Sequence, residues 1–263
     1  MGHTRLGPIP KSYKWDCVVE TVLESAGAGE LASTVPAIAA ITADAARVGL
    51  RRSASDPGLV YSFYLLALLG LAGRGGQTEL PADALRPSEQ DSVYDMLAQF
   101  QLAVDEYVAQ HGGPSDYSEM AQQAAGNALL KALEPQATSL FGSGRDELGT
   151  ALRTISTGSG FSGLAQDFFG DYLARFLNFY LSRVTARTSG YAEFRQLTEF
   201  NEQLRIYSHQ TARIVSDFAS SWLSKTAYLE GISAENTRAF MFVAAKKLAS
   251  ELAAAMAADD GEA

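Results

Sequence analysis

The chain has 263 residues, of which 47% are hydrophobic and 19% are charged, and its formal net charge is -9 at pH 7. This composition is typical of a packed globular protein and is too apolar for a disordered chain. Because proteins that coat nucleic acid present a basic surface, the negative charge makes nucleic acid an unexpected partner. The length permits one large domain or two smaller ones.

Cys17 is the only cysteine, so the chain forms no internal disulfide and no thiolate zinc site. The three histidines, His3, His111 and His209, are too far apart in the sequence to indicate a metal site. We therefore expect neither a metal ion nor a cofactor. Residues 1–11 are rich in glycine and proline, which predicts an extended arm, and they lack the apolar stretch of a secretory signal. We expect a cytoplasmic protein.

Two helices are predicted in the first 50 residues. The first follows Ser12 as its cap, has one apolar stripe from Trp15 to Ala26, and ends at Gly27. The second runs from Thr34 to Val48, with a proline in its first turn, where a missing N–H has no cost.

A short basic patch follows the second predicted helix, at Arg47, Arg51 and Arg52. Cations are favourable at the C-terminus of a helix, so the patch is explained as a solvated helix end. A site for an anion or a lipid headgroup is the alternative that the sequence leaves open.

The most apolar stretch is Pro57–Gly73, which has no charged residue between Asp56 and Arg74. A helix that is apolar on every side is buried in protein or in a lipid bilayer. As a helix this stretch is about 25 Å long, which is shorter than the roughly 30 Å hydrocarbon core of a membrane. We therefore predict a bundle of eight or nine helices around 57–73 as its central helix. Four leucines of this helix are predicted to be buried by protein: Leu65, Leu66, Leu68 and Leu69.

The middle of the chain is predicted to contain three further helices, from Ser88 to Gly112, from Met120 to Leu133, and from Ser143 to Ile155. The segment 134–144 interrupts the helical pattern. If the all-α domain, residues 12–256, is divided into two lobes, they would meet at this segment.

Residues 158–163 have the pattern G-x-G-x-x-G, which in dinucleotide-binding proteins connects a β-strand to a helix. Here a helix precedes the pattern, so we predict a turn rather than a cofactor site. The helix predicted to follow, from Leu164 to Arg187, would present free N–H groups at its start. An anion site at Gly158, Ser159 and Gly160 therefore stays open.

The helix from Leu164 to Arg187 carries an aromatic ladder at i, i+4 spacing. Large aromatic side chains contribute much buried surface, so a core seam is the first interpretation. A face for a protein partner is the second. The ladder consists of Phe168, Tyr172, Phe176 and Tyr180.

A long periodic segment from Tyr191 to Lys225 has an apolar face and a polar ladder with i, i+4 spacing. Within the ladder, Arg205, His209 and Arg213 are the only candidates for catalysis that the sequence offers. Ion pairs on a solvated helix face explain the same pattern. A last helix is predicted from Ser233, followed by an acidic, disordered tail at 257–263.

The sequence thus predicts an all-α protein without a significant β-sheet. No motif indicates a reaction. We expect a non-catalytic interaction or scaffold subunit of a larger bacterial assembly, with another protein or a second copy of the chain as partner. Two alternatives stay open: a membrane-acting effector that inserts 57–73, and a nuclease-like enzyme that uses Arg205, His209 and Arg213.

Overall fold

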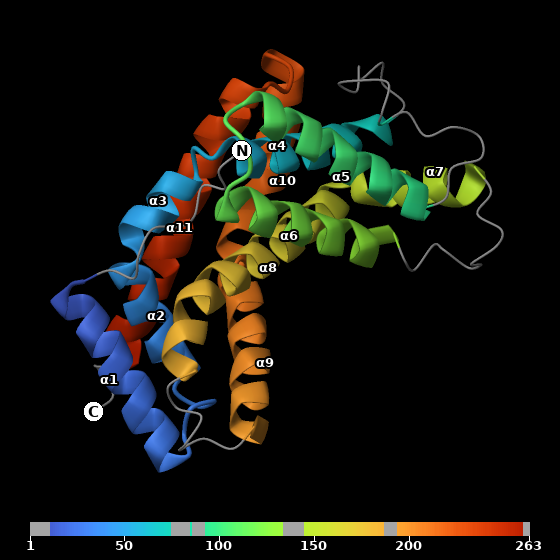
Figure 1. Ribbon diagram of the computed structural model, residues 1–263. Helices are drawn as coiled ribbons and strands as arrows, with labels where there is room; N and C mark the ends of the chain where they lie inside the picture. The colour runs from blue at the N-terminus through green and yellow to red at the C-terminus, as the bar shows by residue number, and fades with distance from the viewer. Residues whose placement is uncertain (1–10, 75–84, 86–92, 134–144, 187–193, 260–263) are drawn as a thin grey trace.

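The computed structural model describes residues 11–74, 85, 93–133, 145–186 and 194–259. Over these residues the chain forms eleven helices and no strand, which confirms the predicted all-α class (Figure 1). The number exceeds the predicted eight or nine because two segments that were predicted as single helices are each broken in two.

The helices follow one another along the whole described chain. The first six are α1 (Tyr13–Ala28), α2 (Val35–Ala45), α3 (Arg47–Ser53), α4 (Pro57–Ala72), α5 (Val93–Gln110) and α6 (Asp116–Leu133). The last five are α7 (Arg145–Ile155), α8 (Gly158–Thr185), α9 (Phe194–Thr211), α10 (Arg213–Leu229) and α11 (Ala234–Asp259).

Three predictions fall wholly or partly outside the described residues. They are the extended arm at 1–11, the helix start at Ser88 and the lobe boundary at 134–144. The predicted tail at 257–263 is described only at its start, where α11 continues through Asp259.

The ends of α1 follow from capping chemistry. The Ser12 side chain accepts a hydrogen bond from the backbone N–H of Trp15, as the sequence predicts. The predicted stop at Gly27 is two residues too early. The left-handed backbone that closes the helix belongs to Gly29, with φ of 79°, where a residue with a Cβ would be strained.

The two unpredicted breaks both occur at alanine. Ala46 separates α2 from α3, and Ala212 separates α9 from α10. Both alanines are buried, and the helices on the two sides of Ala212, α9 and α10, each pack along α8. Alanine is the strongest helix former, so local sequence gave no signal for either break. Tertiary packing determines them.

Helix α4 is buried along almost its whole length. Leu65, Leu66 and Leu69 are 0% exposed and Leu68 is 4% exposed, as predicted. The helix packs against α5, α6, α7 and α11. Among the described residues, no single helix has both the length and the composition to span a membrane, although α3 and α4 meet those criteria as a pair bent by 54°.

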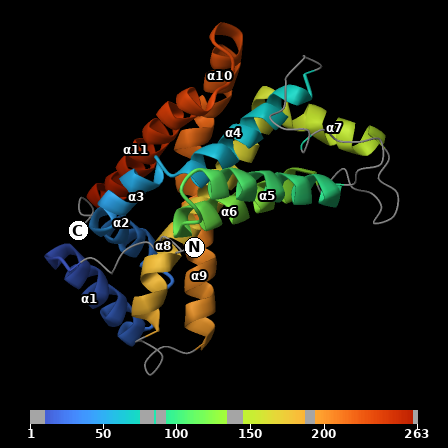
Figure 2. The same ribbon diagram turned by 45° about the horizontal axis from the view of Figure 1, so that its top comes forward.

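The longest helix, α8, lies between two groups of helices. On one side are α1, α2, α3 and α11, and on the other are α5, α6 and α7, in both views (Figures 1 and 2). Helices that are distant in the sequence pack together: α6 contacts α8, and α2 contacts α11. This arrangement creates two concave surfaces, one between α6, α8 and α9 and one between α1, α2, α3 and α11.

Candidate functional site

The aromatic ladder of α8 lies inside the protein. Phe168 contacts Phe63 of α4 with 5.5 Å between ring centroids, and Tyr180 contacts Trp15 of α1 at 6.0 Å. No ring of the ladder is more than 5% exposed, so the ladder packs as a core seam and presents no surface to a partner in this conformation. The buried rings are Phe168, Tyr172, Phe176 and Tyr180.

Residues 158–163 form the first turns of α8, so the prediction of a turn there was wrong. The cap is Thr157, whose Oγ1 accepts a hydrogen bond from the N–H of Gly160 at 3.0 Å. A Cβ at Gly160 would lie 2.0 Å from the carbonyl oxygen of Thr154, so close packing requires this glycine. The cap also occupies one of the N–H donors that an anion at Gly158, Ser159 and Gly160 would need.

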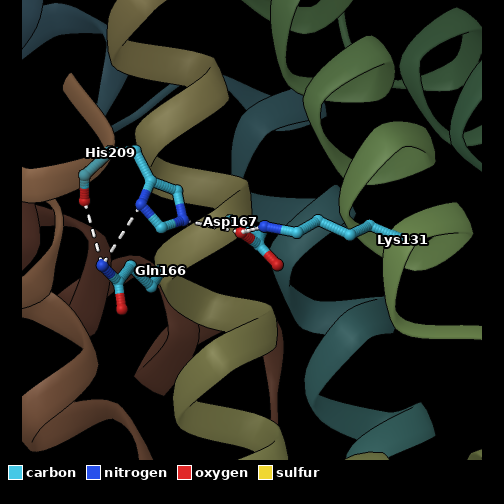
Figure 3. Close-up of polar contacts among 4 residues, drawn as sticks. All are labelled: Lys131, Gln166, Asp167 and His209. Atoms are coloured by element: carbon cyan, nitrogen blue, oxygen red, sulfur yellow. Dashed lines mark hydrogen bonds and ion pairs between the residues drawn. The ribbon is translucent and has the colours of Figure 1, made fainter. Parts of the chain in front are cut away.

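His209 of α9 lies against α8, and both of its ring nitrogens face partners (Figure 3). Nε2 lies 2.7 Å from Oδ1 of Asp167. Nδ1 lies 3.4 Å from the side-chain amide nitrogen of Gln166, which also donates to the His209 carbonyl at 3.1 Å. Lys131 of α6 reaches the same Asp167 oxygen at 2.6 Å. The network therefore joins α6, α8 and α9.

These contacts favour one tautomer of the His209 ring. The Asp167 carboxylate accepts a hydrogen bond from Nε2–H, which makes Nδ1 the acceptor for the Gln166 amide. A general base needs a ring nitrogen that can reach a proton of the substrate. Since both ring nitrogens of His209 contact side chains of α8, His209 holds α9 against α8.

A pocket of about 510 Å³ opens beside His209, between α6, α8 and α9. Arg205 lines this pocket, but its guanidinium pairs with Glu202 at 2.8 Å and lowers the pKa of that carboxyl. Arg213, at the start of α10, is exposed and is not part of the pocket lining. The structure thus brings together two of the three predicted catalytic candidates, Arg205 and His209.

A larger groove of about 870 Å³ lies between α1, α2, α3 and α11. Small and apolar side chains form most of its lining. Helix α11 contributes a stripe at helical spacing: Phe242, Ala245, Ala249 and Ala253. Helix α2 contributes Ala40, Ile41 and Ala43. We refer to this surface as the α11 groove.

The charged residues of the α11 groove are mostly basic, although the chain as a whole is acidic. The single acid, Asp44, pairs with Lys14 at 2.5 Å. Arg47, Arg51 and Lys246 are exposed and form no ion pair with other described residues. The groove therefore combines an apolar lining with a cationic rim.

Sequence reasoning missed the α11 groove because four helices from the two ends of the chain build it. The basic patch containing Arg47 and Arg51 was its only local signal. The third rim cation that forms no ion pair with other described residues, Lys246, belongs to α11, and nothing in the sequence indicates that α11 lies beside α2 and α3.

No protein-family model, curated protein or solved structure matches this chain. Within the part of the chain that the structure describes, no group of three or more His, Cys, Asp or Glu side chains is placed to hold a metal ion. The His209 pocket and the α11 groove are therefore the two candidate functional sites.

Proposed function

We propose that the protein is a non-catalytic interaction or scaffold subunit that binds its partner in the α11 groove. The observation that carries this proposal is an open apolar lining beside exposed cations that form no ion pair with the described residues. Contiguous apolar concavities on a protein surface commonly mark binding sites. Because Ala245 and Ala249 are small, the groove allows the backbone of a partner helix to approach closely, as in helix-in-groove recognition.

The chemistry of the His209 pocket supports a non-catalytic role. Both ring nitrogens of His209 are held by α8, and Arg205 is engaged with Glu202. A nuclease-like reaction would need these groups to face a substrate. We therefore assign the pocket to the packing of α6, α8 and α9.

The burial of α4 argues against the membrane-acting alternative. Exposing a fully buried leucine costs about 1.5–3 kcal/mol. Exposing four of them costs on the order of 6–12 kcal/mol, which is similar to the roughly 5–15 kcal/mol stability of a whole domain. Releasing α4 would therefore unfold the protein, and we propose that α4 acts as the central apolar helix of the bundle.

The unique thiol gives a direct test of the proposed function. Cys17 lines the α11 groove and is partly exposed, and no other cysteine competes for a label. A photoactivatable cross-linker on Cys17, used in cells of the native host, should give one defined cross-linked species that mass spectrometry identifies. Ala249→Trp, which fills the groove, should remove it.

A matched control moves the label off the groove. Ser221 is exposed on α10, so the double variant Cys17→Ser, Ser221→Cys carries one thiol, more accessible than Cys17, away from the site. If this control gives the same products as the wild-type label, or if Ala249→Trp leaves the products unchanged, the groove is not the binding site.

A further inference from the structure

The outer face of α5 has the chemical character that the α11 groove calls for. Tyr94, Ala98 and Leu102 follow one another at i, i+4 spacing, and the two large side chains are 55% and 60% exposed. Asp105 and Glu106 are exposed on the same helix. The face therefore joins an apolar stripe to acidic side chains, whereas the groove joins an apolar lining to basic side chains.

The charges of the two surfaces are available for a contact. Asp105 accepts a hydrogen bond from the neutral amide of Gln122 at 3.0 Å, so its negative charge is not neutralised there. Glu106 forms no ion pair with another described residue. Opposite potentials on two surfaces steer association and set the register of a contact.

The lengths of the two surfaces also agree. The α11 stripe runs from Phe242 to Ala253, which is about 17 Å along the helix axis, and the α5 face from Tyr94 to Glu106 is about 18 Å long. Another exposed apolar pair, Tyr228 and Leu229, occupies only the last turn of α10 and is too short to fill the groove.

We propose that the α11 groove of one chain receives α5 of a second copy, which names the partner in the function proposed above and rests on it. Helix α5 lies on the outside of α4 and α6 and forms a convex ridge. The helices α1, α2, α3 and α11, which line the groove, lie on a different side of the molecule from α5 (Figures 1 and 2). The contact is therefore heterologous: a bound pair still has one free groove on one copy and one free α5 on the other, so the chains form a head-to-tail row or a closed ring.

Sedimentation velocity of the purified full chain tests this proposal. Species larger than the 28.1 kDa monomer should grow with protein concentration and shrink with added salt, because exposed charges are screened. Reversing the groove charges with Arg51→Glu and Lys246→Glu should leave a monomer. Reversing the ridge charges with Asp105→Lys and Glu106→Lys should do the same.

Mixing the two charge-reversed proteins is the decisive measurement. Each is repelled by its own kind, but the reversed groove of one complements the reversed ridge of the other, so the mixture should assemble again. Leu102→Ser removes the apolar anchor without changing charge and should also weaken assembly. The controls Lys225→Glu and Glu230→Lys, at exposed positions on neither surface, should assemble like the wild type.

The proposal is overturned if the wild type is a monomer at every concentration, or if mixing the reversed proteins restores nothing. If the wild type is a monomer while the Cys17 label still cross-links a different protein through the groove, the proposed function stands and only the second copy is rejected. If the wild type is a monomer and the Cys17 label gives no groove-specific product, the proposed function and the second copy as partner are both rejected.

Discussion

At the scale of single residues, Asp56 links two helices through one carboxyl group. One oxygen accepts a hydrogen bond from the backbone N–H of Leu59 at 3.0 Å and so caps α4. The other accepts a hydrogen bond from the hydroxyl of Ser115 at 2.6 Å. Burial nevertheless raises the pKa of this carboxyl, and the hydrogen bonds only partly oppose the effect. The ionised Asp56 carboxylate therefore lowers the free energy of unfolding relative to the protonated carboxyl.

Asp56→Asn should consequently stabilise the protein at pH 7. Asparagine keeps an oxygen for the Leu59 N–H and is an equally good cap. Its amide NH2 can donate to the Ser115 hydroxyl oxygen, and it has no charge to desolvate. Because the folded-state pKa of Asp56 is raised, its contribution to stability is greatest in acid and is lost as the pH rises through that pKa. Thermal unfolding followed by circular dichroism should show a higher Tm for Asp56→Asn at pH 7, with the difference shrinking in acid.

Asp56→Ala is the control for the capping role. It removes the charge and the cap together and should cost about 1 kcal/mol relative to Asp56→Asn. A lower Tm for Asp56→Asn than for the wild type at pH 7 would contradict this account of the carboxyl.

At the scale of elements, the contact of α9 with α8 depends on a glycine. A Cβ at Gly170 would lie 2.8 Å from the Cα of His209, so the bare backbone allows the helices to approach. The sequence did not predict this contact, because a solvated helix face explains the ladder that contains His209 equally well.

Gly170→Ala should therefore destabilise the protein by about 1–3 kcal/mol, the usual cost of overpacking. Gly163→Ala, in the same helix, is the matched control. A Cβ there meets nothing within 4 Å, so the substitution should stabilise the protein by about 0.5–1 kcal/mol through the better helix propensity of alanine. Urea unfolding measures both values. Equal effects at the two glycines would rule out the close crossing as the cause.

At the scale of the whole molecule, helices from the two halves of the sequence share one core. Buried side chains of α4 and α6 pack with those of α8, and α2 packs with α11. Differential scanning calorimetry should therefore show one cooperative transition. Two separable transitions would instead support the division into two lobes that the sequence allowed at 134–144.

The accuracy of the sequence-based predictions depended on how local the determining interaction is. The cap at Ser12 and the burial of Leu65 in an uncharged helix follow from neighbouring residues, and both are confirmed. The breaks at Ala46 and Ala212 depend on helices distant in sequence, and the sequence did not predict them. The start of α8 at Gly158 was also mispredicted, although its cap, Thr157, is a neighbouring residue.

The candidate sites follow the same rule. The sequence identified Arg205 and His209 as neighbours on one helix, but it did not identify their partners. Arg205 forms an ion pair with Glu202. His209 contacts Gln166 and Asp167, which belong to α8. The α11 groove could not be predicted at all, because its walls come together only in the folded chain.

The construction of the α11 groove also sets when it first exists during synthesis. Helices α1, α2 and α3 leave the ribosome long before α11, which supplies the opposite wall. A nascent chain that lacks α11 has the basic residues Arg47 and Arg51 but no groove to place beside them. Under the function proposed above, the groove therefore becomes available to a partner only after α11 has been synthesised and has packed against α2 and α3.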